Sequence, residues 1–150
     1  MAKFIYKFRI LLNLKRQLEE QAKNNMGKAV ARLDREKREL QRIEGVIQMT
    51  IDEFRQISGG RFTVGSIKKY NIFIDKMKKN AEEQKLVIIE AEEEVEIARK
   101  MLVKAMQERE KYEKLEEKER ERYIEDEKRR DNLVIDEIVS YKIGSKADGG

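Results

Sequence analysis

The sequence contains no cysteine, histidine, tryptophan or proline among its 150 residues. Without cysteine the chain can form no disulfide, no thiol nucleophile and no thiolate metal site. Without histidine it can form no Ser-His-Asp triad and no imidazole ligand set. We therefore expect a protein that is not an enzyme, with no catalytic residues, no metal site and no cofactor.

Long apolar runs are also missing. The longest stretch without a formal charge is Gly45–Ile51, which has seven residues, whereas a membrane-spanning helix needs about 20. Near the start of the chain Lys7 and Arg9 interrupt the apolar residues, so we do not expect a signal peptide. The sequence therefore predicts a cytoplasmic protein.

Charged residues, by contrast, make up 43% of the chain, and 34 Lys or Arg against 30 Asp or Glu give a net charge of +4. This composition cannot supply a wide globular core. The absence of proline favours long helices over disorder, because a helix interior excludes proline. No basic run is long enough to predict a nucleic-acid-binding arm, and we expect no nucleic-acid partner.

Turn-forming residues cluster at one place only, at Ser58–Gly60 and Gly65–Ser66. The pattern predicts a single helical hairpin over residues 1–143, with the hydroxyl of Ser66 placed to cap the second helix. The expected elements are a helix over about 3–57, a loop over 58–66, a helix over about 67–141 and a disordered tail over 144–150.

The predicted second helix carries a heptad pattern. Positions spaced alternately by four and three residues from Tyr70 to Glu116 are apolar in eleven of fourteen cases, in a segment otherwise rich in Glu and Lys. An apolar seam with this spacing is typical of a coiled coil. The seam consists of Tyr70, Ile74, Met77, Ala81, Gln84, Ile88, Ala91, Val95, Ala98, Leu102, Ala105, Arg109, Tyr112 and Glu116.

The predicted first helix carries a looser apolar stripe, with a mean spacing of about 3.6 residues. Lys37 is its only charged member, and most of the stripe is expected to be core. The stripe consists of Leu11, Leu14, Leu18, Ala22, Met26, Ala29, Leu33, Lys37, Leu40, Ile43, Ile47, Ile51 and Phe54.

Folding the chain at the loop brings the two stripes face to face. Residue 57−k then lies opposite about residue 67+k, which places Leu18 near Met106 and Phe8 near Glu116. The predicted fold is all-α: a long antiparallel two-helix coiled coil of about 80 Å, in which the C-terminal helix is the longer one.

Two apolar regions stand out from the charged background. Near the C-terminus nothing in the predicted hairpin covers the helix face of Val134, Ile135, Ile138 and Tyr141, and an uncovered apolar helix end suggests a partner's groove. At the loop end, apolar residues are surrounded by lysines, and either a well-packed hairpin end or an interaction surface explains them. These residues are Ile43, Ile47, Ile51, Phe54, Tyr70, Phe73, Ile74 and Met77.

The N-terminus combines aromatic and basic residues, and it has three interpretations. It lies on an anionic membrane, contacts nucleic acid, or docks inside another protein together with the C-terminal end. We favour docking, because both ends of the chain meet at one end of the predicted hairpin. The residues concerned are Lys3, Phe4, Tyr6, Lys7, Phe8 and Arg9.

In their order along the chain these features resemble the FliJ family of the flagellar type III export apparatus. Phe8–Lys15 is similar to the family's F-R-L-x-x-L-L-x-L opening, and Tyr70–Ile74 is similar to its Y-x-x-Y/F-I segment. Arg129–Glu137 looks like the family's polar Q-K-x-x-D-E ending. The resemblance covers nearly the whole chain, including the helical hairpin and its Gly-containing loop.

The resemblance implies a non-enzymatic component that forms the central stalk of the flagellar export ATPase hexamer and links it to the cytoplasmic domain of the export gate, a membrane protein. It also implies a cytoplasmic protein, peripheral at the inner membrane, that meets export chaperones and is a monomeric rod when free. ATPase contacts are expected at Phe4, Phe8, Leu11, Leu12, Val134, Ile135, Ile138 and Tyr141. Export-gate contacts are expected at Ile43, Ile47, Phe54, Phe73 and Met77.

Three alternatives stay open at this point. The stalk protein of virulence-type type III secretion has the same hairpin. A homodimeric coiled-coil scaffold without a motor partner has the same composition, and it would sediment as a stable dimer. A membrane-surface protein would bind anionic liposomes, and salt would abolish the binding.

Overall fold

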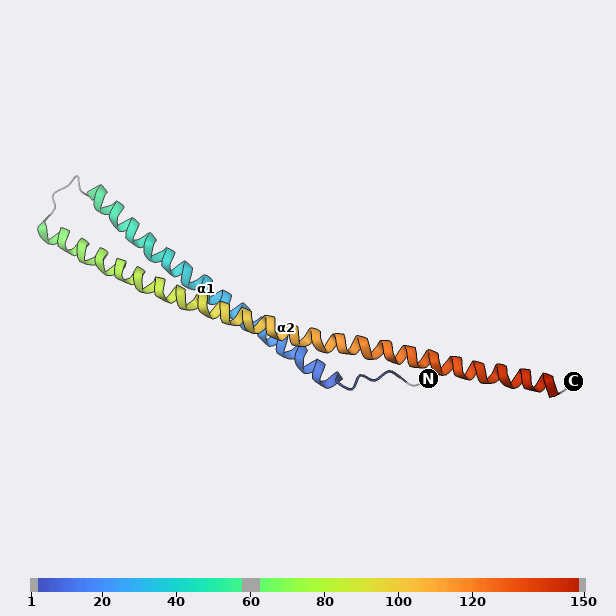
Figure 1. The fold of residues 1–150 in the computed structure, drawn as a ribbon. Coiled ribbons are helices and arrows are strands. Elements are labelled where there is room, and N and C mark those ends of the chain that lie inside the picture. Colours follow the sequence, from blue (N-terminus) through green and yellow to red (C-terminus); the bar gives the residue numbers. More distant parts are fainter. Residues whose placement is uncertain (1–2, 58–62, 149–150) are drawn as a thin grey trace. The chain divides into compact units, whose positions relative to one another are not determined.

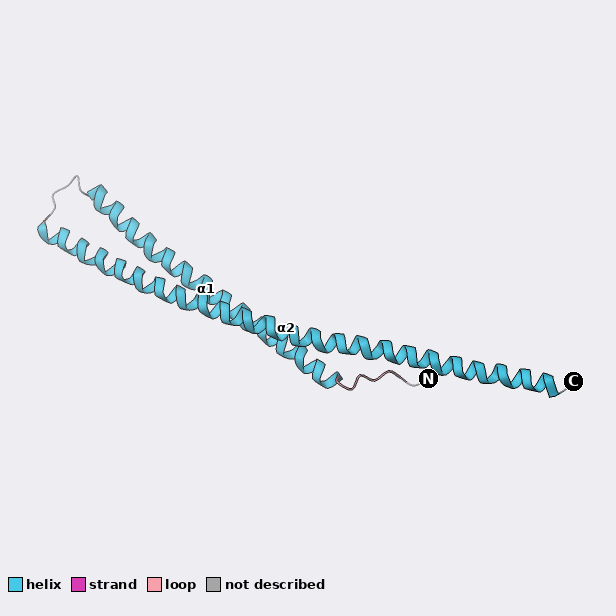
Figure 2. Ribbon diagram, in the orientation of Figure 1, coloured by secondary structure: helices cyan, strands magenta, loops and turns pink. Residues whose placement is uncertain are grey.

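The computed structural model describes residues 3–57 and 63–148. In these ranges it contains two helices, α1 (Arg9–Ile57) and α2 (Val64–Asp148), and no strand (Figures 1 and 2). The helices pack antiparallel as a hairpin, and α2 has 85 residues against 49 in α1. The all-α fold with a longer C-terminal helix, predicted from the sequence, is confirmed.

The helix ends differ from the predicted ones. α1 begins at Arg9 instead of near residue 3, and α2 begins three residues early, at Val64. α2 also continues to Asp148, so the described part of the expected disordered tail is helical. The one glycine there, Gly144, costs a helix only about 1 kcal/mol, and no proline stops it. Two predicted segments lie outside the described residues, namely 58–62 of the loop and 149–150 of the tail.

Thr63, and not Ser66 as predicted, caps the N-terminus of α2. The Thr63 hydroxyl oxygen accepts a hydrogen bond from the Ser66 backbone N–H at 3.2 Å. The Thr63 carbonyl oxygen accepts from the N–H groups of Ser66 and Ile67 at 3.0 and 3.3 Å. Both Thr and Ser are good capping residues, but a cap at Thr63 satisfies backbone donors in the first turn and adds three residues to the helix.

Residues 3–8 form a non-helical segment, here called the N-terminal arm, where the first turns of a helix were expected. Along the arm the three aromatic side chains are buried or half-buried and the residues between them are exposed. Alternation with a period of two suits an extended chain, because in a helix residues i and i+2 do not share a side. The inward residues are Phe4, Tyr6 and Phe8, and the outward residues are Lys3, Ile5 and Lys7.

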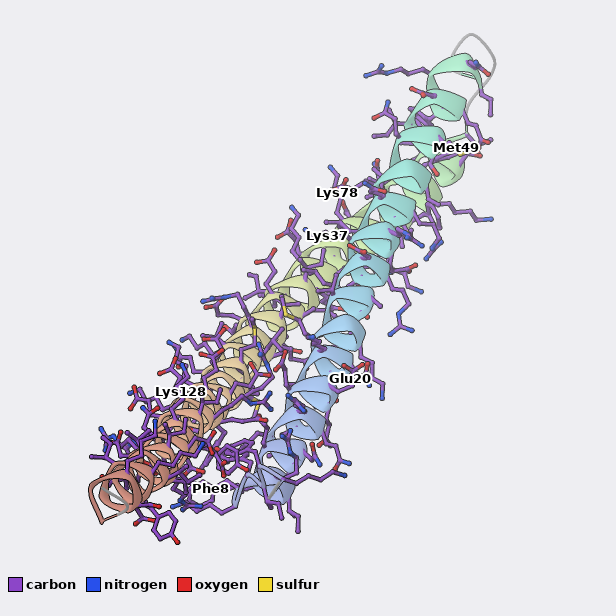
Figure 3. All side chains as sticks on the ribbon, turned by 90° about the vertical axis from the view of Figure 1, so that its right-hand side faces the viewer. Phe8, Glu20, Lys37, Met49, Lys78 and Lys128 are labelled. Atoms are coloured by element: carbon purple, nitrogen blue, oxygen red, sulfur yellow. The ribbon has the colours of Figure 1, made fainter. Side chains whose placement is uncertain are left out.

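The hairpin divides into two compact units that share both helices. The terminal unit consists of Met1–Glu19 and Ala105–Gly150, and the loop unit consists of Glu20–Lys104. Each unit therefore contains one segment of α1 and one segment of α2. In both, charged side chains surround the ribbon (Figure 3), so each unit has a narrow core.

The heptad seam predicted for α2 is confirmed, since all fourteen positions are buried or half-buried. One of its polar members, Gln84, lies in the loop unit. Its side-chain amide donates to the backbone carbonyl of Glu36 at 2.9 Å and to the Glu36 carboxylate at 2.6 Å. A polar residue thus occupies a seam position because a partner on α1 satisfies its hydrogen bonds.

The other two polar members, Arg109 and Glu116, lie in the terminal unit. Arg109 forms an ion pair with Glu19, whose side chain is buried, and a second one with Glu113 at 2.8 Å. The hydrogen bond to Glu19 raises the pKa of Arg109 above its ordinary value, against the opposing effect of burial. Glu116 forms an ion pair with Arg9 at the start of α1. All three polar seam residues of α2 therefore bind α1.

The stripe predicted for α1 is wrong at Leu14, Leu18 and Lys37, which are exposed. The observed seam alternates strictly by three and four residues. Three of its four polar members have partners on α2, and Lys15 Nζ, for example, lies 3.4 Å from Glu108 Oε2. The fourth, Thr50, donates a hydrogen bond to the Val46 backbone carbonyl of α1. The prediction was wrong at Leu14 and Leu18 because it assigned apolar residues to the seam where polar residues occupy it. The seam residues are Leu12, Lys15, Glu19, Ala22, Met26, Ala29, Leu33, Glu36, Leu40, Ile43, Ile47, Thr50 and Phe54.

The pairing of the two helices agrees with the predicted register to within about one helical turn. Phe8, expected opposite Glu116, packs edge-on against Tyr112 with ring centroids 6.1 Å apart. In the loop unit Phe54 packs against Tyr70 with ring centroids 5.0 Å apart. Contacts in both units thus support the same antiparallel register.

In the part of the chain that the structure describes, neither helix has a segment long and apolar enough to cross a membrane.

The buried carboxylate of Glu19 should matter for stability. Glu19→Ala leaves the half-buried Arg109 without this partner, although the bond to Glu113 remains, and we expect the free energy of unfolding to fall by about 2 kcal/mol. Urea unfolding followed by helical circular dichroism measures the change. Glu20→Ala, which removes the exposed neighbouring carboxylate, is the matched control and should cost less than about 0.5 kcal/mol. Equal losses in the two variants would contradict this role of Glu19.

Candidate partner-binding surfaces

The N-terminal arm lies against α2 within the terminal unit. The Tyr6 hydroxyl donates a hydrogen bond to the backbone carbonyl oxygen of Tyr112 at 2.8 Å, and the Tyr6 side chain is almost completely buried. The Phe4 ring packs against the Tyr123 ring with centroids 5.6 Å apart. The arm therefore extends the cover over α2 beyond the start of α1, as far as Tyr123.

Charged groups border the arm but contribute less to holding it. Lys7 Nζ lies 3.6 Å from Glu119 Oε1, and the Arg120 guanidinium lies 5.3 Å from the centroid of the Phe4 ring. Exposed ion pairs of this kind contribute about 0–1 kcal/mol each. Buried and half-buried aromatic side chains, with the buried hydrogen bond of Tyr6, are therefore the main attachment of the arm.

Four of the eight predicted ATPase contacts take part in this packing. Leu12 is completely buried, whereas Phe4, Phe8 and Leu11 are half-buried. Their side chains hold the arm and α1 against α2. Only part of their surface is accessible to a partner, and for Leu12 none is.

Sequence reasoning missed an exposed apolar row on α1 in the terminal unit. Ile10, Leu14 and Leu18 are exposed, and a spacing of four residues places them on one side of the helix. The spacing itself was the available signal. It was attributed to the seam because the polar residue Glu19 did not look like a core position.

The other four predicted ATPase contacts lie on α2 beyond the arm. Val134, Ile135, Ile138 and Tyr141 are exposed, as is every residue from 128 to 146. Within the described ranges, no other segment of the chain covers this part of α2. The structure thus places an apolar helix segment in water.

Apolar side chains occupy one broad side of this segment, here called the C-terminal face. At about 100° per residue, its members span somewhat more than half of the helix circumference. Asp136, Glu137 and Ser140 lie on the opposite side together with the exposed Leu133, and Lys142 lies within the apolar side. The C-terminal face consists of Val134, Ile135, Ile138, Val139, Tyr141 and Ile143.

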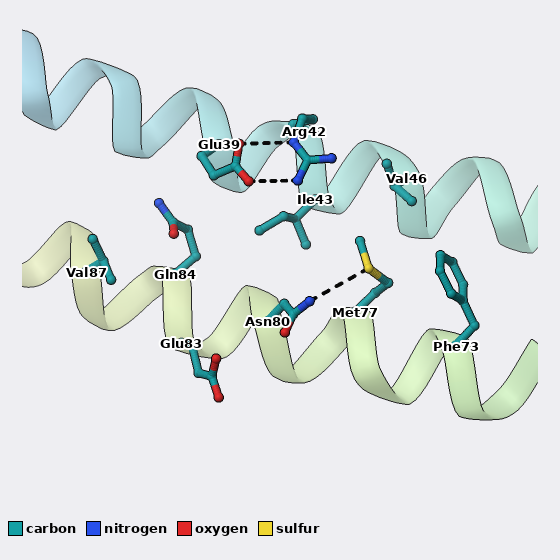
Figure 4. Close-up of a pocket in the computed structure, with 10 residues that line it drawn as sticks. All are labelled: Glu39, Arg42, Ile43, Val46, Phe73, Met77, Asn80, Glu83, Gln84 and Val87. Atoms are coloured by element: carbon teal, nitrogen blue, oxygen red, sulfur yellow. Dashed lines mark hydrogen bonds and ion pairs between the residues drawn. The ribbon is translucent and has the colours of Figure 1, made fainter.

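The loop unit contains a groove of about 550 Å³ between α1 and α2. Figure 4 shows Ile43 of α1 pointing toward α2, and Phe73 and Met77 of α2 pointing toward α1. The structure therefore brings together three of the five predicted gate contacts. The full lining is Glu39, Arg42, Ile43, Val46, Phe73, Met77, Asn80, Glu83, Gln84 and Val87.

Polar groups border the apolar centre of the groove. Arg42 donates two hydrogen bonds to the carboxylate of Glu39, at 3.0 and 2.7 Å, and these bonds lower the pKa of Glu39 and raise that of Arg42. Asn80 Nδ2 lies 4.0 Å from the sulfur of Met77. An apolar floor with a polar rim is the usual anatomy of a protein-binding site.

The remaining predicted gate contacts, Ile47 and Phe54, are half-buried members of the α1 seam. Phe54 packs against Tyr70, which also lines a second hollow of about 200 Å³ together with Thr50, Lys69 and Phe73. Phe73 belongs to both hollows, so they are neighbours on the same surface. The apolar loop end is therefore partly packed core and partly open groove.

Neither surface has the residues of a metal centre. Among residues 3–57 and 63–148, no three Asp or Glu side chains are grouped so as to hold a metal ion. The chemistry that the two surfaces offer is apolar contact bordered by charge, as in protein recognition.

In a comparison with protein families, the model of the family described as flagellar FliJ protein matches residues 4–147. These residues include most of the arm, α1, nearly all of α2 and the C-terminal face. No curated protein and no solved structure matches the chain.

The ionisation of Tyr6 should report on the arm. Burial raises the pKa of Tyr6 above its ordinary value of 10.0, and the carboxylates of Glu119 and Glu116 raise it further. The neutral phenol therefore stabilises the packed arm below pH 10, and this contribution is lost as the pH rises through the raised pKa. In an ultraviolet titration of tyrosinate, Tyr6→Phe should remove part of the absorbance that appears above pH 10.

Tyr141→Phe serves as the control, because it also removes one tyrosine but leaves every contact of the arm intact. If the two variants lost the same part of the titration curve, Tyr6 would not be buried against α2 in solution.

Proposed function

The chain belongs to the flagellar FliJ protein family, and on this basis we propose that it forms the central stalk of the flagellar export ATPase hexamer and links that ATPase to the export gate. Members of the family are non-catalytic components of flagellar protein export. The match to a flagellar family favours flagellar export over virulence-type secretion. The stalk role and the two partners are the proposal.

The C-terminal face is the observation that carries the proposed stalk role. A helix exposing Val134, Ile138 and Tyr141 to water gains free energy when a partner covers them, at roughly 25 cal/mol per Å² of apolar surface. These residues continue the side of α2 that the arm covers up to Tyr123 and that ends with the half-buried Glu127. An ATPase ring that encloses this segment would complete a core that the chain leaves unfinished.

The N-terminal side of the terminal unit supports the same contact. Phe4, Phe8 and Leu11 keep part of their surface accessible, and Leu12 holds them in place from inside. The exposed residue Ile10 adds to this surface. We propose that both chain ends contact the ATPase.

The groove of the loop unit supports the proposed gate contact. Phe73 and Met77 form its apolar floor together with the buried Ile43. Grooves between packed helices suit a projecting side chain or short segment of a partner protein. In this proposal the protein is a monomer when free, lies peripherally at the cytoplasmic face of the inner membrane through the export apparatus, and has export chaperones as further partners.

Charges placed on the C-terminal face should abolish stimulation of the export ATPase. In the triple variant Val134→Asp, Ile135→Asp and Ile138→Asp, three carboxylates would have to be buried without partners on docking. We expect stimulation of ATP hydrolysis to fall at least tenfold while helical circular dichroism is unchanged.

A triple variant with aspartate at Leu86, Ile89 and Ile97 is the control. These residues are equally exposed and apolar but lie in the loop unit, so stimulation should be retained. Full stimulation by the first variant would exclude docking through the C-terminal face.

Removing apolar side chains from the groove should weaken binding to the export gate and leave stimulation of the ATPase unchanged. Phe73→Ala with Met77→Ala removes two apolar anchors, and we expect roughly a tenfold weaker affinity for the cytoplasmic domain of the gate. Isothermal calorimetry measures this affinity, with Leu86→Ala as the control on the other side of α2. An unchanged affinity would show that the groove is not the gate site.

A further inference from the structure

The first turns of α2 carry a face that neither the hairpin seam nor the groove uses. Its centre is Ile72, which is 65% exposed, and four exposed lysines surround it. We call this set the lysine face: Lys68, Lys69, Lys76 and Lys79 around Ile72.

The spacing of these residues places them on one side of α2. Lys68 and Lys76 lie four residues before and after Ile72, and Lys79 lies seven residues after it, so these three lie within about 40° of Ile72 around the helix, and Lys69 lies about 60° from it. The seam residues Tyr70, Ile74 and Met77 lie on the opposite side or near it, toward α1. The lysine face therefore points away from α1.

The lysines of this region outnumber its carboxylates. Residues 63–80 contain five lysines and one acidic residue, whereas residues 81–98 contain one lysine and seven acidic residues. Several basic side chains elsewhere in the loop unit have carboxylate partners, as in the pairs Arg32–Glu94, Arg42–Glu39 and Lys85–Glu82. Lys68, Lys69, Lys76, Lys78 and Lys79 form no ion pair with any described residue.

Asp52, near the end of α1, does not neutralise the lysine face either. Asp52 is exposed, accepts a hydrogen bond from Gln48 at 3.1 Å, and lies about half a turn away from the α1 seam. It thus points away from α2, on the other side of the hairpin. Asp75, about 60° from Ile72 around the helix, is the one acidic residue beside the face, against the lysines that surround Ile72. A net positive patch with an apolar centre is left facing water.

We propose that the lysine face binds the anionic phospholipid headgroups of a membrane surface. Lysine stems can lie along the bilayer while their ammonium groups reach the phosphates, and Ile72 inserts between the headgroups. Basic clusters next to apolar residues on a helix are suited to such surfaces, which demand charge rather than a matching shape.

This contact goes beyond the proposed function and is compatible with it. Phe73 and Met77 lie about 100–140° around the helix from Ile72, so a membrane on the lysine face leaves the groove open. The contact would be peripheral and reversible, because a few lysines and one inserted side chain do not anchor a protein permanently. Its strength should fall as salt screens the lysines.

Cosedimentation of the full chain with lipid vesicles tests the proposal. Binding is expected to vesicles of phosphatidylcholine and phosphatidylglycerol, and not to vesicles of phosphatidylcholine alone. The triple variant Lys68→Gln, Lys76→Gln and Lys79→Gln should lose roughly fivefold in affinity per lysine, hence on the order of a hundredfold at low salt. Ile72→Ser should weaken binding less and leave the salt dependence unchanged.

The control variant Lys37→Gln, Lys100→Gln and Lys104→Gln removes the same charge from exposed positions outside the face, and it should retain most of the binding. Equal losses of vesicle affinity in the two triple variants would show that binding depends on net charge alone, and this result would overturn the proposal. Absence of vesicle binding at low salt would also overturn it.

Light scattering of the same proteins tests whether a second copy of the chain, instead of a membrane, binds the lysine face. A dimer that the Lys68, Lys76 and Lys79 variant abolishes would assign the lysine face to a second copy, whose residues 81–98 are acidic, and would overturn the lipid assignment. ATPase stimulation and gate affinity should be unchanged in this variant, so failure of the lipid contact and failure of the stalk role are separate results.

Discussion

The structure depends on a single heptad seam between α1 and α2. In a chain with 43% charged residues, only one narrow stripe on each helix can be buried, and a 3.5-residue spacing keeps the two stripes facing each other. Polar residues in the seam then require partners at fixed places on the other helix. Glu19 with Arg109 and Gln84 with Glu36 meet this requirement, and a shift of the helices by one heptad would separate both pairs. The polar members therefore select the register, while the apolar members supply the burial.

A seam this narrow also explains why the protein exposes so much apolar surface. Apolar residues outside the two stripes have no place in the hairpin, so Ile72, Leu86 and Ile97 lie in water. α2 is also longer than α1, and the arm covers it only as far as Tyr123, after which the C-terminal face is open. The C-terminal face, which we propose as a binding surface, thus consists of apolar residues that the fold cannot bury, and it begins where the seam ends.

The sequence predicted the elements and the α2 seam because eleven of fourteen seam positions there are apolar. It failed on α1, where Glu19 and Glu36 occupy the seam, since their partners lie 90 and 48 residues away and no local pattern reveals them. The arm was missed because its alternation spans six residues, too few to outweigh the helical pattern that follows. At the candidate surfaces, the apolarity of Val134 and Phe73 in a charged background predicted that the hairpin would not bury them, and both are exposed. The groove was not predicted, because its shape depends on side chains from both helices.

Ion pairing distinguishes the charged side chains that already have a partner within the chain from those that are available to an external partner. Ion pairs such as Arg99–Glu96 and Arg42–Glu39 join neighbouring residues of one helix, so a partner that approached them would have to compete with an existing bond. The lysine face has no such bonds, and its electrostatic free energy is gained only when an external anion arrives. The C-terminal face differs from the lysine face, because the free energy gained when a partner covers it comes from burial of apolar surface and is nearly independent of salt. Two contacts with different physical origins, one in each unit, can therefore respond to different conditions, and raising the ionic strength should release the lysine face while leaving the C-terminal face engaged.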